Sequence, residues 1–288
     1  MAAVIMAGAP VVEAVTEAVR DRVAALAAEG VTVGLGTILV GDDPASAGYI
    51  RKKHEASGAT GIRSFDVHLP AAATQAELLA AVQAFNDDPA VDAFLIQNPV
   101  PRGLDFNAAL AAMDPDKDAD GLHPSNLGRL ALGVDGPVPC TPAGIQAILA
   151  HYQVPVEGRH VVIVGRGPTL GRPLAMLLSL KRQGANAAVT VVHTGVPDWA
   201  DYTRRADIVV GAAGVPNMIG PSAVRPGAAV VGGGISWAGK RLVSDVDESV
   251  AEVAGWVTPR LGGVGPTTVA MLLRNAVDAA ARRRGFDV

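Results

Sequence analysis

The chain has 288 residues, of which 49% are hydrophobic and 18% are charged, so it can bury one large core or two medium-sized ones. The formal net charge of −4 argues against nucleic-acid binding, which usually requires a basic stripe or a basic excess. The single cysteine, Cys140, excludes an internal disulfide and fits a reducing, cytoplasmic environment. No apolar run is long enough to span a membrane, and the apolar N-terminus lacks the basic start of a signal peptide.

Predicted helices and strands alternate through the first half of the chain. Apolar residues from Val12 to Leu26 recur at spacings of three and four, which predicts an amphipathic helix that ends at Gly30. The next predicted elements are a buried strand at 31–40, a helix at 45–59, a strand at 63–69, a helix from the capping box at 74–77 to residue 85, a strand at 93–97 and a short helix near 107–113. An acidic, turn-rich loop, 114–121, follows.

The segment 137–142, PVPCTP, is a predicted domain boundary. Thr141 is a good helix cap and Pro142 suits the first helical position, so we expect a helix from there to about residue 152. The later predicted elements are strands at 161–164, 188–192, 207–212 and 228–231, a helix at 171–181 and a long last helix at 267–284. This alternation predicts an α/β chain of two domains, each with a mostly parallel sheet flanked by helices.

A glycine-rich turn lies between the strand at 161–164 and the next helix, in the sequence HVVIVGRGPTLGRPL. Glycines stand at 165, 167 and 171, in the strand–turn–helix layout of a Rossmann-type dinucleotide-binding unit. Such a turn lets the backbone approach a pyrophosphate, and the helix start supplies unpaired N–H groups. The spacing is one residue longer than the standard motif, so a plain chain reversal explains the motif alone equally well.

The residues around this turn favour NADP over NAD. An NAD-binding unit usually carries Asp or Glu near the end of its second strand, where the acid holds the ribose hydroxyls. Here the strand 188–192 is followed by His193 and Thr194, with no acid. Arg166 lies inside the glycine turn, where its charge suits the 2′-phosphate of NADP.

Four polar or aromatic residues are predicted to meet at one edge of the first sheet. Tyr49 and Lys53 are four apart, so they share one helix face just after the strand 31–40. Gln97 ends the strand 93–97, and Asp120 lies in the acidic loop that follows the next helix. Ligands bind at the carboxyl ends of the strands in open α/β sheets. A lysine there can act as acid or base, a glutamine can hold it, a carboxylate can bind a polar heterocycle and an aromatic ring can stack on it.

Each of these residues also has a plainer interpretation. Tyr49 and Lys53 could form a solvated helix face, and Gln97 could cap its strand. The acidic loop lacks the spacing of an EF-hand, so turn formation explains most of its carboxylates. The six histidines show no metal-ligand spacing, and we predict no metal site.

Taken together, five stretches in the same order resemble the bifunctional methylenetetrahydrofolate dehydrogenase/methenyltetrahydrofolate cyclohydrolase family, and they cover nearly the whole chain. They are Gly41-Asp-Asp-Pro-Ala-Ser46-x-x-Tyr49-x-x-x-Lys53, Ile96-Gln97-x-Pro99-x-Pro101, Asp116-Lys-Asp-x-Asp120-Gly121, Pro139-Cys-Thr-Pro142 and Gly262-Gly-Val-Gly-Pro266-x-Thr268.

The resemblance implies a folate-binding catalytic domain of residues 1–140 plus 269–288 and a Rossmann-type NADP-binding domain of residues 141–268. It also implies tetrahydrofolate derivatives as substrates, a homodimer, and a cytoplasmic role in one-carbon metabolism that serves purine, methionine and histidine biosynthesis. The enzyme would oxidise 5,10-methylenetetrahydrofolate with NADP and hydrolyse the methenyl product to 10-formyltetrahydrofolate.

The resemblance also assigns roles to individual residues. Lys53 would be the acid/base of the cyclohydrolase with Gln97 as its partner, while Tyr49 would stack on the folate and Asp120 would hold the pterin ring. Arg166 and Thr194 would line the 2′-phosphate site. The other implied contacts are Gly165, Gly167, Gly171 and Ile235 with the cofactor, and Gly262 and Pro266 with the substrate.

The chain departs from the family pattern at four places: Asn98 for Leu, Gly167 for Ser, Gly232-Gly233-Gly234 for a strand end like Asp-Val-Gly, and Ala7 and Ala9 for Asp and Lys. Two alternatives stay open from the sequence. One is a non-catalytic nucleotide-binding regulator, which needs only the glycine turn. The other is a different NADP-dependent dehydrogenase, for example of shikimate-like substrates, although the Lys53 helix argues against it.

Overall fold

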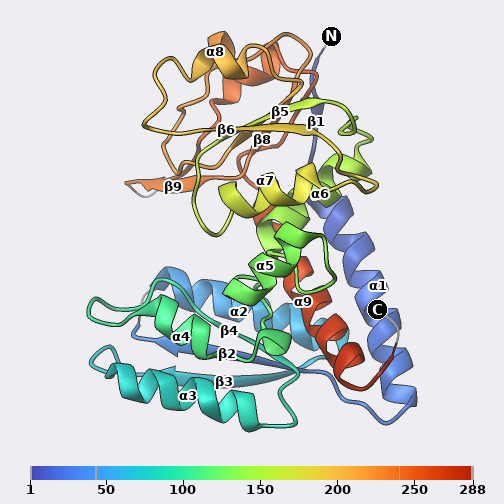
Figure 1. Ribbon diagram of the computed structural model, residues 1–288, viewed down its shortest axis with the longest axis vertical. Coiled ribbons are helices and arrows are strands. Elements are labelled where there is room, and N and C mark those ends of the chain that lie inside the picture. Colours follow the sequence, from blue (N-terminus) through green and yellow to red (C-terminus); the bar gives the residue numbers. More distant parts are fainter. Residues whose placement is uncertain (1, 43, 240, 287–288) are drawn as a thin grey trace. The chain divides into compact units, whose positions relative to one another are not determined.

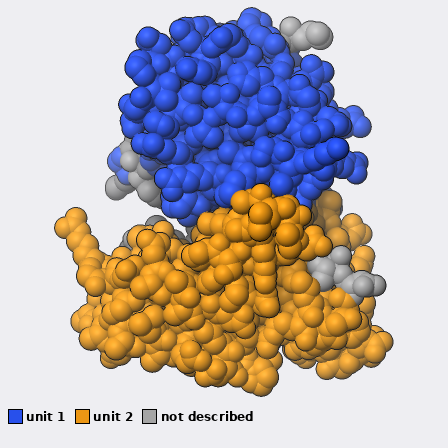
Figure 2. Space-filling model, in the orientation of Figure 1, with its two compact units in different colours: residues 1–13, 139–268 blue, residues 14–138, 269–288 orange. Residues whose placement is uncertain are grey.

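The computed structural model describes residues 2–42, 44–239 and 241–286. The chain forms two compact units, which Figure 2 shows in blue and orange. Unit 1 comprises Met1–Glu13 and Pro139–Thr268, and unit 2 comprises Ala14–Val138 and Val269–Val288. This division differs from the predicted domain of residues 1–140 at its start. Residues 1–13 belong with the glycine-turn unit because the strand β1 (Val4–Ile5) pairs with β11 (Trp256–Val257) of that unit.

Unit 2 is built on a parallel three-stranded sheet in the order β3–β2–β4. The strands are β2 (Gly34–Val40), β3 (Arg63–Leu69) and β4 (Ala93–Ile96), joined by the helices α2 (Pro44–Thr60) and α3 (Gln75–Asp87). The chain moves from β2 to β3 in one direction and returns past β2 to β4. Right-handed crossovers therefore place α2 and α3 on opposite faces of the sheet. Thr74 caps α3 in the predicted capping box.

One face of this sheet packs against α3 and α4 (Phe106–Ala112), as the lower part of Figure 1 shows. Phe85 of α3 meets Phe94 of β4 edge to face, with ring centroids 5.3 Å apart. Pairs of this kind contribute about 0.5–1.5 kcal/mol beyond the area they bury. The other elements of unit 2 are η1 (Pro115–Lys117), α5 (Pro124–Leu132), most of α1 (Ala9–Ala28) and most of α9 (Val264–Arg283).

The buried carboxylate of Asp92 holds the end of α9 against the sheet of unit 2. It accepts hydrogen bonds from Arg284 at 2.6 Å and from the backbone N–H of Gly34 at 2.9 Å. Arg283 lies 3.6 Å from the same carboxylate. A buried charge is tolerated when it is paired and hydrogen-bonded, so this contact fixes the C-terminal helix to the strands.

Unit 1 contains a parallel six-stranded sheet in the order β1–β11–β8–β7–β5–β6, with an antiparallel hairpin, β9–β10, beside it. Its remaining elements are α6 (Cys140–His151), β5 (His160–Val164), α7 (Gly171–Ser179), β6 (Ala188–Val192), α8 (Ala200–Thr203), β7 (Ile208–Gly211), η2 (Pro221–Ala223), β8 (Ala229–Gly232), β9 (Ile235–Ala238), β10 (Arg241–Ser244) and η3 (Glu248–Glu252). The predicted fold class, two α/β domains with mostly parallel sheets, is confirmed.

The structure differs from the predicted elements at several points. Helix α6 begins at Cys140, with Pro139 as its N-cap and no side-chain cap, so the predicted capping role of Thr141 is wrong. The Thr141 hydroxyl instead lies 3.2 Å from that of Thr268. The sequence-based prediction also missed β1, α5, α8, the β9–β10 hairpin and β11. In the described part of the chain, no helix has both the length and the hydropathy to cross a membrane.

Candidate active site

The candidate active site of unit 2 begins at the carboxyl ends of β2 and β4. The strand order reverses there, because β3 lies on one side of β2 and β4 lies on the other. Such a switch point is where open α/β sheets bind ligands. Gln97 directly follows β4, and its backbone N–H donates to the carbonyl of Ile38 in β2 at 2.8 Å. Helix α2, which carries Lys53, follows β2.

Lys53 and Gln97 form a hydrogen-bonded pair at this switch point. Lys53 is only 6% exposed, and its Nζ donates to Gln97 Oε1 at 3.2 Å. The amide Nε2 of Gln97 donates in turn to the backbone carbonyl of Asn98 at 2.9 Å. The acceptor is the backbone carbonyl of residue 98, so Asn98 can provide it as well as the Leu of the family pattern would. A solvated helix face does not explain a buried lysine that is held in this way.

The loop that carries Asp120 is fixed to the sheet and to α9. Asp118 accepts hydrogen bonds from the N–H groups of Gly121 at 2.9 Å and His123 at 2.7 Å, and from Asn126 Nδ2 at 3.0 Å. The N–H of Ala119 donates to the carbonyl of Phe94 in β4 at 3.1 Å. On its other side, the carbonyl of Ala119 accepts from Asn275 Nδ2 at 2.9 Å.

The charge of Lys53 acts on the carboxyl of Asp120. Burial raises the pKa of the Asp120 carboxyl above its ordinary value of 3.8. The Lys53 ammonium opposes that rise, and the Asp118 carboxylate adds to it. Desolvation disfavours the charged form of an acid, whereas a nearby cation favours it. The structure therefore brings Lys53, Gln97 and Asp120 together.

The other acidic-loop residues have structural roles. Asp114 caps η1 by accepting from the N–H of Asp116, and Asp116 pairs with Arg129 at 2.8 Å. The buried Lys117 donates to the carbonyls of Phe85 and Asp88, each at 2.8 Å, and burial lowers its pKa. Among the described residues, no group of three His, Cys, Asp or Glu side chains is placed to hold a metal ion.

Three other predicted substrate residues lie apart from this cluster or outside the description. The side chain of Tyr49 lies outside the described part of the structure, so its stacking role stays a prediction. Gly262 and Pro266 belong to unit 1, where Gly262 precedes α9 and Pro266 lies in its first turn. The carbonyl of Gly262 accepts from the N–H of Gly8 at 2.7 Å. Their substrate contacts also stay predictions.

The glycine turn of unit 1 lies at a second switch point, between β5 and β7. Gly165 has φ +128°, and a Cβ there would lie 2.1 Å from the carbonyl oxygen of Ala212 after β7. A Cβ at Gly171 would lie 2.3 Å from the carbonyl oxygen of Gly165. Neither position can hold another residue without a shift of backbone. Gly167 has nothing within 4 Å of such an added atom, so its departure from Ser is not required by packing.

Arg166 and Thr194 are presented by neighbouring parallel strands. Val164 at the end of β5 pairs with Val192 at the end of β6, and each candidate residue comes two positions later. Both are exposed. The N–H of Gly165 donates to the carbonyl of Val192 at 2.8 Å, which ties the two turns together. The arrangement presents an exposed cation and an exposed hydroxyl side by side in the sheet order, and this is the chemistry that an anion site requires.

The glycines at 232–234 replace larger residues of the family pattern for a visible steric reason. A Cβ at Gly232 would lie 2.4 Å from Ser244 Oγ, and one at Gly233 would lie 2.8 Å from Leu170 Cδ2 and 3.0 Å from the carbonyl oxygen of Gly211. The next residue, the candidate cofactor contact Ile235, begins β9 and is 45% exposed. Ser244 of β10 and Leu170 before α7 therefore occupy space that side chains at positions 232 and 233 would need.

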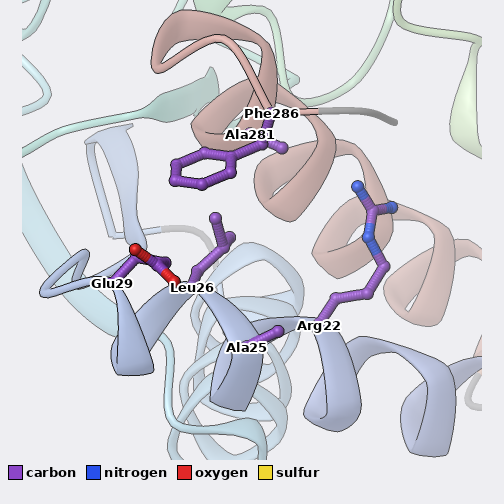
Figure 3. A pocket seen from close by; sticks show the side chains of 6 residues that line it. All are labelled: Arg22, Ala25, Leu26, Glu29, Ala281 and Phe286. Carbon is purple, nitrogen blue, oxygen red and sulfur yellow. The ribbon is translucent and has the colours of Figure 1, made fainter.

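A separate pocket of about 360 Å³ lies between α1 and the end of the chain in unit 2 (Figure 3). The Phe286 ring faces Leu26 across it, and Arg22 and Glu29 contribute opposite charges. Arg22 is already paired with Asp278 of α9. None of the predicted site residues lines this pocket, so it is distinct from the Lys53 cluster.

Two family models match the chain. The catalytic domain of tetrahydrofolate dehydrogenase/cyclohydrolase matches residues 6–120, and the NAD(P)-binding domain of the same family matches residues 139–284. The chain belongs to the tetrahydrofolate dehydrogenase/cyclohydrolase family. The resemblance stated from the sequence motifs is confirmed, and the family favours a folate enzyme over the regulator and the other dehydrogenases considered above. The second match includes the whole of α9, most of which belongs to unit 2.

Relatives along the full length agree with this assignment. The bifunctional protein FolD of Syntrophotalea carbinolica is 62% identical over 288 residues, which is 99% of each chain. The FolD structure from Campylobacter jejuni has a TM-score of 0.93 at 38% identity and covers 98% of this chain and 100% of that one. The methylenetetrahydrofolate dehydrogenase-cyclohydrolase of Trypanosoma brucei, solved with NADP and an inhibitor, has a TM-score of 0.93 at 38% identity over 99% of both chains.

Asp118 and Asn275 hold the loop that carries Asp120, and the motifs did not single out either residue. Asp118 is one of several carboxylates in the acidic loop. The sequence does not distinguish it from its neighbours, although in the structure it is buried and accepts three hydrogen bonds. Asn275 lies far from the loop in sequence, and only the docking of α9 brings it to Ala119. The sequence offered one signal, a lone Asn on the apolar side of the last predicted helix.

Proposed function

We propose that this chain catalyses two consecutive reactions on one folate. The first is the NADP-dependent oxidation of 5,10-methylenetetrahydrofolate to 5,10-methenyltetrahydrofolate, and the second is hydrolysis of that product to 10-formyltetrahydrofolate. The observation that carries the proposal is the buried Lys53–Gln97 pair beside Asp120, in a chain of this family. Lys53, Gln97 and Asp120 are the groups that act on the substrate.

Asp120 binds the pterin ring in this proposal. A pterin presents N–H donors along one edge, and a carboxylate offers two acceptor oxygens that match them. The loop that carries Asp120 is held on two sides, by Phe94 and by Asn275, so the carboxylate is positioned before substrate arrives. Tyr49, one turn before Lys53 on α2, supplies the stacking face.

Lys53 acts as the general acid and base in the hydrolysis step. Water attacks the electron-poor methenyl carbon and loses one proton, which gives a hydroxyl adduct. As the bond to the ring nitrogen breaks, that nitrogen gains a proton and the hydroxyl loses one to become the formyl C=O, so one proton is released overall. A lysine amine held at the reacting carbon can accept and return protons in these steps. The Gln97 side chain accepts from Nζ and therefore fixes where the amine points. Asp120, whose charge is coupled to Lys53, binds the same substrate nearby.

The glycine turn of unit 1 fits a dinucleotide. Gly165 and Gly171 keep the backbone open where a Cβ would clash, which is the property that pyrophosphate binding at a helix start requires. Bound NADP would supply the acceptor for the hydride that leaves the methylene carbon. Gly165, Gly167 and Gly171 would hold the pyrophosphate, Ile235 would contact the cofactor, and Arg166 with Thr194 would bind the 2′-phosphate.

NADP is expected to be preferred over NAD. A charge-assisted hydrogen bond contributes about 1.5–3 kcal/mol, so the kcat/KM ratio of the two cofactors should be about tenfold or more. Steady-state rates with each cofactor, at one folate concentration, measure this ratio. Equal kcat/KM values would remove the 2′-phosphate role of Arg166.

The proposal has two further parts. The chain forms a homodimer through unit 1, and it acts in the cytoplasm in one-carbon metabolism that serves purine, methionine and histidine biosynthesis. Their support is the family resemblance. Light scattering at micromolar concentration tests the dimer, and a stable monomer would contradict it.

The decisive experiment for the activity follows two absorbance signals from the purified protein at once. Reduced NADP and the methenyl intermediate absorb in the ultraviolet, so a coupled record shows oxidation and hydrolysis separately. The expected result is NADP reduction with transient methenyl absorbance that decays to the formyl product. No change in either signal with methylenetetrahydrofolate would contradict the enzyme and favour a nucleotide-binding regulator.

A further inference from the structure

The turn after β6 is closed by a histidine side chain. The N–H of Gly195 donates to His193 Nδ1 at 3.1 Å, and the N–H of Val196 donates to the carbonyl of His193 at 2.8 Å. A backbone N–H can only donate, so Nδ1 is the unprotonated ring nitrogen and the proton is on Nε2. Thr194 lies at the exposed tip of this closed turn.

The ring of His193 folds back over Gly195. A Cβ at position 195 would lie 3.2 Å from His193 Cε1 and 3.3 Å from Nδ1, which is tighter than ordinary contact. Unit 2 uses the same arrangement, since His123 Nδ1 accepts from the N–H of Ser125 at 3.0 Å at the start of α5. In both places the imidazole nitrogen takes the position of the Asn side-chain oxygen in an Asx turn.

This turn has a fixed position relative to the glycine turn. The carbonyl of Val192, directly before His193, accepts from the N–H of Gly165, directly before Arg166. Arg166 and Thr194 are therefore presented on turns that follow one pair of bonded strands. A long arginine side chain can adjust to a phosphate, whereas the short side chain of Thr194 depends on the shape of its own turn.

We propose that His193 is a positioning residue for cofactor selectivity: its Nδ1 holds the turn that presents Thr194 to the 2′-phosphate of NADP. The inference rests on the proposed function, because it takes Arg166 and Thr194 as the 2′-phosphate site. NAD has no 2′-phosphate, so loss of the turn weakens NADP binding and leaves NAD binding nearly unchanged. The imidazole acts through the backbone of the turn and not by contact with the phosphate.

Two variants of one position test the role. His193→Ala removes the acceptor, and His193→Asn restores an acceptor oxygen at the same place in the turn. The dissociation constants of NADP, NAD, 2′,5′-ADP and 5′-AMP are measured by calorimetry, so that the readout does not depend on turnover. In His193→Ala, affinity for NADP and 2′,5′-ADP should fall roughly three- to tenfold, the effect of one hydrogen bond. In His193→Asn both affinities should stay within about twofold of the parent protein.

His160→Ala is the matched control. His160 lies at the opposite end of the β5–β6 pair, where its Nε2 lies 3.0 Å from the Thr190 hydroxyl. A general loss of packing between these strands would weaken all four ligands, and the control measures that effect. The NADP to NAD ratio should therefore be unchanged in His160→Ala.

Three outcomes overturn the inference. An unchanged NADP to NAD ratio in His193→Ala removes the role, and a loss in His193→Asn as large as in His193→Ala means that the imidazole itself is needed. Equal affinity of the parent protein for 2′,5′-ADP and 5′-AMP removes the 2′-phosphate site. The proposed folate activity is judged separately, by the two-signal absorbance record, so it can hold when the His193 inference fails.

Discussion

At the scale of single residues, the charge of Asp120 depends on Lys53. Burial and Asp118 raise the pKa of Asp120, and the Lys53 ammonium is the cation that opposes them. The two residues come from different elements, α2 and the loop after η1, and meet only because both follow strands that end at one switch point. A change at Lys53 therefore removes the proton carrier of our proposal and also raises the pKa of Asp120, the carboxyl that we propose binds the pterin.

The first prediction concerns Lys53→Met, which keeps the apolar stem and removes the amine. Loss of one general acid/base lowers a rate by roughly 10²–10⁴-fold, so cyclohydrolase activity should nearly vanish. Hydride transfer needs alignment more than proton transfer, so dehydrogenase activity should fall less, with weaker folate binding and accumulation of the methenyl compound. Both rates are measured on the purified variant. Lys181→Met, at an exposed lysine, is the control, and unchanged cyclohydrolase in Lys53→Met would contradict the mechanism.

The second prediction concerns Asp120→Asn and stability. The folded pKa of Asp120 is raised above 3.8, so its stabilising contribution is complete below pH 3.8 and is lost as the pH rises through the folded value. A neutral amide avoids that loss. The variant should therefore have a higher Tm than the parent at pH 7, and the difference should shrink as the pH falls toward 3.8, while folate turnover is lost.

Asp247→Asn is the comparison with the opposite sign. Hydrogen bonds from Ser249 lower the pKa of Asp247, so its contribution is present above pH 3.8 and is lost as the pH falls through the folded value. An Asn side chain can still cap η3, but its hydrogen bonds to Ser249 lack the contribution of the carboxylate charge. The variant should therefore be slightly less stable than the parent at pH 7. A lower Tm of Asp120→Asn at pH 7 would contradict the assignment of burial as the main cause.

At the scale of elements, the glycine turn combines positions that packing fixes with one that it leaves free. Gly165 and Gly171 approach backbone oxygens, whereas Gly167 faces open space. We predict that Gly165→Ala and Gly171→Ala abolish NADP binding and lower the Tm, because the turn and the start of α7 must move. Gly167→Ser should bind NADP at least as well as the parent. Calorimetry and thermal unfolding of the three variants check this, and a Gly167→Ser protein that fails to bind would show that the position is constrained by the ligand.

Which elements the sequence could predict follows from their length and pattern. The strands of unit 2 have enough apolar residues to be predicted, and a capping box marks the start of α3. The structure has these elements close to the predicted bounds, although β2 begins at Gly34 and not at residue 31. β1 and β11 have two residues each and carry no period, so only their pairing in the sheet defines them. Because β1 was missed, the predicted domains did not group residues 1–13 with the glycine-turn unit, as the structure does.

The same limit applies to the candidate site. The Lys53–Gln97 contact could be anticipated, since both residues follow parallel strands and such strand ends meet at one edge. The support from Asn275 could not, because it depends on how α9 docks, 156 residues away from Ala119 in the sequence. The fold of His193 over Gly195 depends on a side-chain rotamer, which no spacing encodes.

At the scale of the whole molecule, each unit places its candidate site at its own switch point, and α9 connects the two units in sequence. The helix begins in unit 1 at Val264 and contributes most of its length to unit 2. Met271, Leu272, Leu273 and Val277 are all nearly inaccessible. Burial of side chains of this kind contributes about 1.5–3 kcal/mol each, a large share of the 5–15 kcal/mol that stabilises a typical domain.

The last prediction is that a change in α9 destabilises the two units unequally. Leu273→Ala leaves a cavity in unit 2 and should cost about 2–5 kcal/mol there, while Arg274→Ala at the half-buried neighbouring position should cost about 1 kcal/mol at most. NADP binds unit 1 in our proposal, and at 100 times its dissociation constant it stabilises that unit by about 2.7 kcal/mol. A thermal scan of Leu273→Ala with saturating NADP should therefore show two transitions, with the earlier one assigned to unit 2 by limited proteolysis. A single transition that shifts as a whole with NADP would mean that the units unfold together.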